Sequence, residues 1–183
     1  MNKFRIGISG KKGSGKDTLC NFLITELALN HCIVPGVVSF ANFLKEIVEQ
    51  CFVPSDMLID WNNYEDKKRI LPCGKSVREV LQMVGTDWFR NLWPDAWVNC
   101  AKRAIEAADA EVIIIPDVRF PNEVDFCQEN GVVIRLLRAP YSDNHPSETA
   151  LDDYKFEHII DNRGMSIIQC HEQANDILRR ILP

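Results

Sequence analysis

The sequence lacks the features of several protein classes. No apolar run among its 183 residues approaches the ~18 residues that span a membrane, and there is no repeat or low-complexity tract. Its seven cysteines include no C-x-x-C pair, so neither a zinc site nor a disulfide framework is expected. The net charge of −5 leaves no positive excess for a nucleic-acid polymer or an acidic membrane. These absences favour a cytoplasmic globular protein, with no signal peptide before a first strand that begins at residue 4.

The pattern of apolar residues predicts a single α/β domain over residues 1–183. Apolar residues make up 46% of the chain and charged residues 26%, which are ordinary globular values. Continuous apolar runs indicate strands buried on both faces, and therefore a parallel, doubly wound sheet of about five strands flanked by helices. The expected strands are residues 4–8, 37–40, 112–115, 132–137 and 157–160. The expected helices are residues 15–29, a helical insertion within 42–108, residues 121–130 beginning at Pro121, and residues 166–181 with Ile167, His171, Ala174, Leu178 and Ile181 on one side.

Residues 10–18, G-K-K-G-S-G-K-D-T, predict a phosphate-binding loop. They match G-x-x-x-x-G-K, except that Asp17 stands in place of the usual Ser or Thr. The glycines let successive backbone N–H groups point at phosphate oxygens, and the following helix presents its positive N-terminus to the same anion. We expect this loop to bind the phosphates of ATP through Gly10, Lys12, Gly13, Ser14, Gly15, Lys16, Asp17 and Thr18.

Asp117 follows the apolar strand 112–115, in the arrangement of a Walker-B carboxylate. It would hold Mg²⁺ directly or through water. Either Asp17 takes the metal-ligand place of the missing hydroxyl, or Asp17 caps the helix while Thr18 reaches the metal.

Arg119 and Arg138 each follow a strand, and we expect both to approach the transferred phosphoryl group. Glu123 either complements the dipole of the helix that begins at Pro121 or contacts the substrate.

The insertion carries a second group of polar residues. Arg78 and Gln82 lie four apart on one side of a predicted helix, and residues 85–87, G-T-D, should break that helix so that Thr86 or Asp87 caps the next one, which carries Arg90. These residues either hold a phosphate and a base edge or form a solvated helix face. Trp88 and Trp97 either stack on a base or pack in a core. The polar loop 139–156 has the length of a lid, and its His145 should be exposed.

Together these motifs resemble the phage deoxynucleoside monophosphate kinases, a branch of the P-loop nucleotide kinases. The resemblance implies ATP, Mg²⁺ and a deoxynucleoside 5′-monophosphate (dNMP) acceptor, with the insertion as the monophosphate-binding arm. It also favours a homodimer, located in the host cytoplasm if the chain is phage-encoded. The motifs that carry it are residues 9–18, Val77-Arg78, Leu81-Gln82, residues 85–87, Trp97-Val98, residues 115–119 with Glu123, and residues 132–134 leading to Arg138. The implied substrate residues are Arg78, Gln82, Thr86, Asp87, Arg90, Trp97 and Glu123.

Other functions share parts of this pattern. Phosphomevalonate kinases carry a similar Gly-Lys-Asp loop, so a kinase of another phosphorylated metabolite is an alternative. A nucleotide-driven switch or ATPase usually places a glutamate after the Walker-B aspartate to orient water, whereas this chain has Val118 there and no N-K-x-D tetrapeptide. A nucleotide-binding module without catalysis would not need the arginines and Asp117. The sequence therefore favours phosphoryl transfer to a bound acceptor over hydrolysis.

Overall fold

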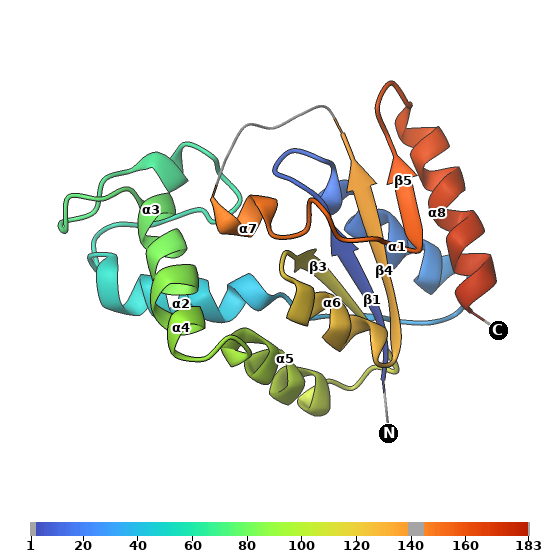
Figure 1. The fold of residues 1–183 in the computed structure, drawn as a ribbon, viewed down its shortest axis with the longest axis horizontal. Helices are drawn as coiled ribbons and strands as arrows, with labels where there is room; N and C mark the ends of the chain where they lie inside the picture. Colours follow the sequence, from blue (N-terminus) through green and yellow to red (C-terminus); the bar gives the residue numbers. More distant parts are fainter. Residues whose placement is uncertain (1–2, 139–144, 183) are drawn as a thin grey trace. The chain divides into compact units, whose positions relative to one another are not determined.

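The computed structural model describes residues 3–138 and 145–182 (Figure 1). The chain divides into two compact units. The first comprises residues 1–39 and 101–183, and the second comprises residues 40–100. Within the described residues, no helix has both the length and the apolar character needed to cross a bilayer.

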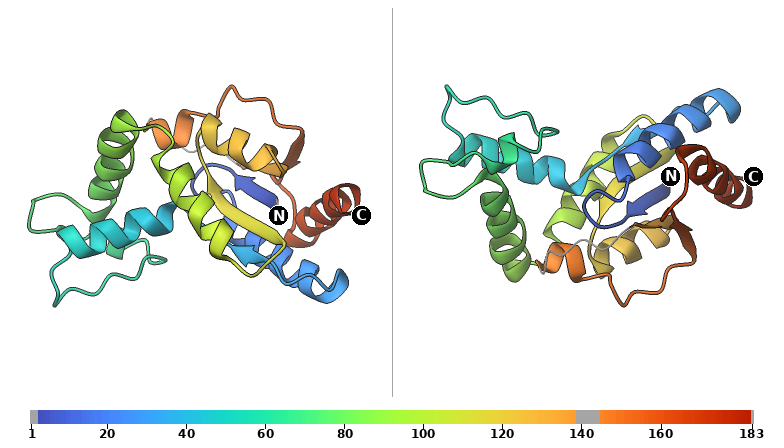
Figure 2. Two further views of the ribbon diagram at one scale, coloured as in Figure 1. Left: turned by 90° about the horizontal axis from the view of Figure 1, so that it is seen from below. Right: turned by 90° about the horizontal axis from the view of Figure 1, so that it is seen from above.

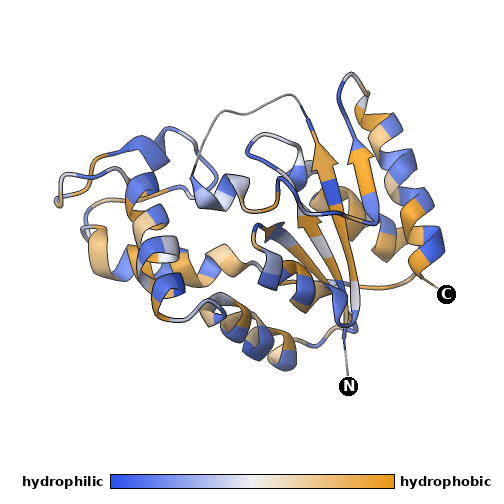
Figure 3. Cartoon of the chain, in the orientation of Figure 1, coloured by the Kyte–Doolittle hydropathy of each residue, from blue (hydrophilic) through white to orange (hydrophobic). Residues whose placement is uncertain are grey.

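The first unit contains a five-stranded, fully parallel sheet in the order β2-β3-β1-β4-β5 (Figure 1). The apolar runs form these strands because both faces of the sheet are covered, and the central strands are largely hydrophobic along their length (Figure 3). The five strands are β1 (Phe4–Ser9), β2 (Gly36–Val37), β3 (Val112–Val118), β4 (Gly131–Leu137) and β5 (His158–Asp161).

Helices cover the sheet on its two faces. On one face, α1 (Lys16–Asn30) and α8 (Ile167–Ile181) share a buried core with the strands. α6 (Pro121–Gln128) packs on β1 and β4 from the opposite face (Figure 2). The α1–α8 core includes Leu23, Leu27, Ile134 and Leu178, all fully buried. Since full burial of one such side chain contributes about 1.5–3 kcal/mol, this core holds the first unit together.

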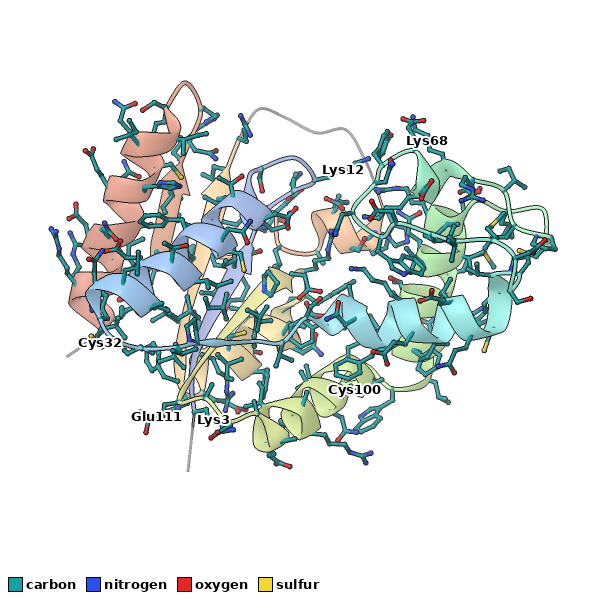
Figure 4. All side chains as sticks on the ribbon, turned by 180° about the vertical axis from the view of Figure 1, so that it is seen from behind. Lys3, Lys12, Cys32, Lys68, Cys100 and Glu111 are labelled. Carbon is teal, nitrogen blue, oxygen red and sulfur yellow. The ribbon has the colours of Figure 1, made fainter. Side chains whose placement is uncertain are left out.

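The strand order creates a ligand-binding edge. β1 and β3 are neighbours, and the chain leaves them in opposite directions: from β1 to β2 on one side, and from β3 to β4 on the other side of β1. The adjacent carboxyl ends of β1 and β3 therefore lie at a topological switch point. Ser9 at the end of β1 pairs with Val118 at the end of β3. Figure 4 labels Lys12 at this end of the sheet and Lys3 and Glu111 at the other. Parallel α/β sheets bind their ligands at the carboxyl edge.

The second unit is helical. Its core contains Val48, Leu71, Val77, Val80 and Val84, with Ile59 at its edge. Its elements are α2 (Phe40–Phe52), the short 3₁₀ turn η1 (Asp66–Lys68), α3 (Val77–Gln82), the π-helical turn η2 (Met83–Trp88) and α4 (Phe89–Leu92). α5 (Ala96–Ala107) runs from the second unit into the first.

The fold class is confirmed, and several details of the elements differ from the prediction. The second strand was expected over residues 37–40, but β2 ends at Val37 and α2 begins at Phe40. The expected break at residues 85–87 is wrong, because the chain continues from α3 through the π turn into α4 without leaving the helical path. The predicted side of the last helix is buried at Ala174 and Leu178, whereas Ile167 is 63% exposed, since it is the first residue of α8 after the capping Ser166.

The predicted lid loop, residues 139–156, contains a short helix. Residues 139–144 lie outside the described part of the chain, and α7 (Pro146–Thr149) follows. His145 was expected to be exposed, which is wrong: it is half-buried, and its Nδ1 accepts a hydrogen bond from the Ser147 N–H at 3.2 Å. His145 therefore caps the N-terminus of α7.

Candidate nucleotide-binding site

The loop between β1 and α1 has the curled geometry that a phosphate-binding loop requires. Gly15 adopts a left-handed conformation with φ 95°, which a residue with a side chain rarely adopts. Gly10 is needed for space, because a Cβ there would lie 2.4 Å from Ser14 Oγ. α1 begins at Lys16, directly after the curl, so its first N–H groups face the loop.

Lys16 lies across this loop. Its Nζ donates to the carbonyl of Gly10 at 2.6 Å and to that of Lys11 at 2.9 Å. Burial, and after it the charge of Arg119, lowers the pKa of Lys16 to about 8. A bound phosphate would supply the opposite charge that this ammonium lacks, so the geometry of the loop and Lys16 suits a phosphate.

Asp117 lies in β3, one residue before the partner of Ser9, and so stands beside the start of the loop. Its Oδ2 accepts a hydrogen bond from Ser39 Oγ at 2.8 Å. Asp17 is exposed in the first turn of α1. Burial raises the pKa of the Cys20 thiol to about 11, with smaller contributions from the charges of Asp17 and Asp117. Both carboxylates therefore lie within electrostatic range of one thiol. Sequence reasoning missed Ser39, which carries no motif of its own.

The oxygen-bearing side chains near the loop suit a metal ion that takes most of its ligands from a bound nucleotide. Within residues 3–138 and 145–182, no group of three or more His, Cys, Asp or Glu side chains is arranged to hold a metal ion. Mg²⁺ commonly takes one or two carboxylates and completes its shell with substrate phosphates and water. Asp117, with Asp17 or the exposed Thr18, fits that donor set.

Arg119 is held by a residue that the sequence did not indicate. Its Nη1 forms an ion pair with Oε1 of Glu148 in α7 and donates to the Ser147 carbonyl at 3.2 Å. Oε2 of Glu148 accepts a hydrogen bond from the Lys12 backbone N–H at 3.0 Å. Burial alone would raise the pKa of the Glu148 carboxyl, but Arg119 and these hydrogen bonds hold it below its ordinary value. Lys12 and Glu148 are 136 residues apart in the sequence, so no local pattern could have predicted their hydrogen bond.

Two further cations reach the loop from β4. Arg138, at the end of this strand, is exposed, and its Nη1 donates to the Gly13 carbonyl at 3.2 Å. Arg135 is 7% exposed within β4 and donates to Ser9 Oγ at 2.9 Å. Sequence reasoning missed Arg135, although a cation inside the otherwise apolar run 132–137 was a visible signal.

Glu123 lies in the first turn of α6, where its carboxylate binds backbone N–H groups. Its side chain is buried, and its Oε2 accepts hydrogen bonds from the backbone N–H groups of Arg119 at 2.7 Å and Phe120 at 3.1 Å. This is the helix-terminus alternative: the carboxylate satisfies two donors at the start of α6. Because those donors flank Arg119, Glu123 also fixes the backbone that presents this arginine. A substrate contact for Glu123 stays a prediction.

The second unit gathers most of the predicted substrate residues on one helical run, residues 77–92. Arg78, Gln82, Thr86 and Arg90 are spaced four apart, a spacing that drifts around an α-helix of 3.6 residues per turn. The wider π turn at Met83–Trp88 counteracts this drift, and π turns are frequent at functional sites. Arg78, Gln82, Thr86 and Arg90 are half-buried, whereas Asp87 is exposed. Arg90 Nη1 donates to the Pro94 carbonyl at 3.2 Å.

Trp97 is a buried residue of the second unit. It is 4% exposed, its Nε1 donates to the Gly85 carbonyl at 2.9 Å, and its ring lies 5.0 Å from that of Phe89. This is the core-packing alternative, in which Trp97 fixes the π turn. Trp88, by contrast, is 50% exposed, and its ring lies 6.1 Å from that of Phe52.

Comparison with solved structures agrees with this fold. Shikimate kinase from Acinetobacter baumannii is 12% identical, with a TM-score of 0.52 over 100% of this chain and 97% of that one. Shikimate kinase from Bacteroides thetaiotaomicron is 15% identical, with a TM-score of 0.51 over 97% and 99% of the two chains. At these identities the likeness concerns the fold, which is that of P-loop kinases.

Comparison of sequences identifies the family. A protein of Acanthamoeba polyphaga mimivirus, whose name assigns it provisionally to the deoxynucleotide monophosphate kinases, is 32% identical over 94% of this chain and 98% of its own. The deoxynucleoside-5′-monophosphate kinase of Escherichia phage T5 is 29% identical over 70% of this chain and 55% of its own. The family model described as deoxynucleotide monophosphate kinase matches residues 56–169. The chain belongs to the deoxynucleotide monophosphate kinase family.

Proposed function

We propose that this deoxynucleotide monophosphate kinase transfers the γ-phosphate of ATP to a dNMP in a reaction that requires Mg²⁺. The observation that carries the proposal is the adjacency of the Lys16 loop and Asp117, which the pairing of Ser9 with Val118 brings to one edge of the sheet. A phosphate-binding loop beside a metal-binding carboxylate is the arrangement that phosphoryl transfer from a nucleoside triphosphate needs.

The donor nucleotide would bind through the loop and α1. Backbone N–H groups of the loop, including that of Lys12, would donate to its phosphates, and Lys16 would exchange the Gly10 and Lys11 carbonyls for β- and γ-phosphate oxygens. Because the transition state is loose and spreads charge over the equatorial oxygens, these groups act mainly by positioning the phosphates and neutralising their charge.

Asp117 would hold Mg²⁺, with Asp17 or Thr18 as the second protein ligand. When bound, the ion would supply positive charge that offsets the charge of the phosphates. The Ser39 hydroxyl, 2.8 Å from Asp117 Oδ2, fixes the orientation of this carboxylate. Asp17 and Thr18 differ in chemistry, and substituting each in turn would show which one serves the metal.

Arginines would complete the site. Arg119 and Arg138, both in the first unit, would donate to the transferred phosphoryl group as its charge shifts. Arg78 and Arg90, both on residues 77–92, would hold the phosphate of the acceptor, with Gln82 and Thr86 facing its base or sugar. A single arginine at such a centre contributes ~10³-fold or more in rate where it has been measured.

A substrate panel tests the proposal. Purified enzyme with ATP and Mg²⁺ is offered dGMP, dTMP, dCMP, dAMP and 5-phosphomevalonate, and ADP release is followed with a coupled assay. We expect turnover with one or more of the deoxynucleotides and slow ADP release without an acceptor. Activity on phosphomevalonate alone, or rapid ATP hydrolysis without an acceptor, would refute the proposed reaction.

Two substitutions test the roles of single residues. We expect Lys16→Ala and Asp117→Asn each to reduce kcat/KM by ~10³-fold or more, because each removes charge stabilisation at the triphosphate. Glu106→Gln, at an exposed position of α5, is the matched control and should keep wild-type rates. Circular dichroism and thermal unfolding verify the fold. Near-normal turnover of either variant contradicts its assigned role.

A further inference from the structure

Glu148 binds the donors that a phosphate would bind. Its side chain is 3% exposed, with one carboxylate oxygen on the Arg119 guanidinium and the other 3.0 Å from the Lys12 backbone N–H. A backbone N–H of the phosphate-binding loop and a guanidinium are the two kinds of donor that recognise phosphate at this edge of the sheet. Glu148 therefore presents two anionic oxygens to the loop as a phosphate group does.

A second carboxylate from the same segment reinforces this contact. Asp152 accepts from Lys11 Nζ at 2.8 Å and lies 3.7 Å from Arg135 Nη2. Residues 146–152 are thus tied to the loop at two consecutive positions, Lys11 and Lys12. Glu148 is the buried member of the pair, whereas the Asp152 carboxylate is partly exposed to solvent and so is screened.

Glu148 and a triphosphate cannot keep these positions together. Glu148 acts electrostatically on Lys16, the residue proposed to hold the β- and γ-phosphates. A triphosphate would bring several negative charges next to a carboxylate in a poorly solvated site, where like charges repel strongly. One of the two anions has to leave the Lys12 amide.

We propose that Glu148 is an internal competitor for the phosphate site, which occupies the Lys12 amide and Arg119 in the nucleotide-free enzyme and is displaced when the triphosphate binds. The proposal rests on the proposed function of the loop. Its consequence is a weaker affinity for the triphosphate, because binding has to break the contacts of Glu148. It also keeps Arg119 paired until the nucleotide arrives.

A neutral variant separates this role from a positioning role. Glu148→Gln keeps the shape of the side chain and removes its charge. Isothermal titration with Mg-ATP and with tripolyphosphate, which lacks the base and sugar, should give a Kd about tenfold lower than for wild type. Asp153→Asn, which removes an exposed carboxylate directly after residues 146–152, is the control and should change Kd by less than about twofold. An unchanged or higher Kd in Glu148→Gln overturns the proposal. A fall in kcat at unchanged Kd also overturns it and would make Glu148 a positioning residue for Arg119.

A measurement on the wild-type chain covers the case in which Glu148→Gln does not fold. Displacement of Glu148 frees α7 from the loop, so amide hydrogen exchange at residues 147–150 should become faster when tripolyphosphate and Mg²⁺ saturate the enzyme. Unchanged or slower exchange there contradicts displacement. If wild type binds neither tripolyphosphate nor ATP, the proposed function fails, an outcome distinct from binding that Glu148 does not influence.

Discussion

At the level of single residues, the candidate nucleotide-binding site brings several cationic side chains close to carboxylates that partly neutralise them. Arg119 and Arg135 both act electrostatically on Lys16, Glu148 pairs with Arg119, and Asp152 lies near Arg135. Burial is the first cause of the lowered pKa of Lys16, and Arg119 is the second. Without nucleotide, the charged form of Lys16 therefore destabilises the fold.

This lowered pKa predicts how stability changes with pH. The unfolded chain, in which Lys16 has a pKa near 10.5, binds more protons than the folded chain between about pH 8 and about pH 10.5. The Lys16 contribution to the free energy of unfolding should therefore rise with pH across this window, by roughly 2 kcal/mol. We expect the difference in unfolding free energy between wild type and Lys16→Met, measured by urea titration without metal or nucleotide, to rise by that amount. A difference that stays flat or falls from about pH 7.5 to about pH 10.5 contradicts the low pKa.

Glu123 distinguishes a structural carboxylate from a substrate contact. Glu123→Ala leaves two backbone donors at the start of α6 without their partner, and each buried unpaired donor costs about 1–3 kcal/mol. We expect a loss of roughly 2–6 kcal/mol in urea unfolding, with the KM for the dNMP unchanged. The control, Glu129→Ala, removes an exposed carboxylate 3.4 Å from Arg5 and should cost less than about 1 kcal/mol. A raised KM at normal stability would favour the substrate contact instead.

At the level of elements, the sequence predicted the sheet well and the tertiary contacts poorly. The strands are continuous apolar runs and the loop is a local motif, so β1, β3 and α1 could be located from their own residues. The π turn could not, because G-T-D at residues 85–87 has the composition of a helix break. In the structure the helix continues through Gly85, whose carbonyl accepts a hydrogen bond from Trp97. Trp97 is 12 residues away, so the residues around Gly85 do not reveal this contact. Glu148 and Ser39 were missed for the same reason, since each contacts residues distant in sequence.

The π turn depends on Trp97. Trp97→Phe keeps the aromatic packing against Phe89 but removes the buried hydrogen bond to Gly85, at a cost of about 1–3 kcal/mol. Trp93→Phe is the matched control: Trp93 is 49% exposed, so its change should cost less than about 0.5 kcal/mol. Denaturant unfolding measures both. Equal costs for the two variants would show that the hydrogen bond to Gly85 contributes nothing to the π turn.

At the level of the whole molecule, the two units carry different parts of the proposed chemistry. The first unit holds Lys16, Asp117, Arg119 and Arg138, and the second holds Arg78, Gln82, Thr86 and Arg90. The proposed function assigns the triphosphate to the first unit and the acceptor phosphate to the second. Substitutions should therefore affect the two substrates separately, according to the unit in which they lie.

Arg78→Ala tests this division of roles. Arg78 is half-buried on residues 77–92, where a guanidinium can bind a phosphate through two parallel hydrogen bonds. Its loss should raise the KM for the dNMP by about tenfold or more, because a charge-assisted hydrogen bond contributes about 1.5–3 kcal/mol, while the KM for ATP changes by less than about twofold. Lys75→Ala removes an exposed charge from the same unit and should leave both constants near their wild-type values. Steady-state kinetics with each substrate varied in turn measures all four constants. If Arg78→Ala raised the KM for ATP as much as that for the monophosphate, the acceptor site could not be assigned to the second unit alone, because a residue of that unit would then serve both nucleotides.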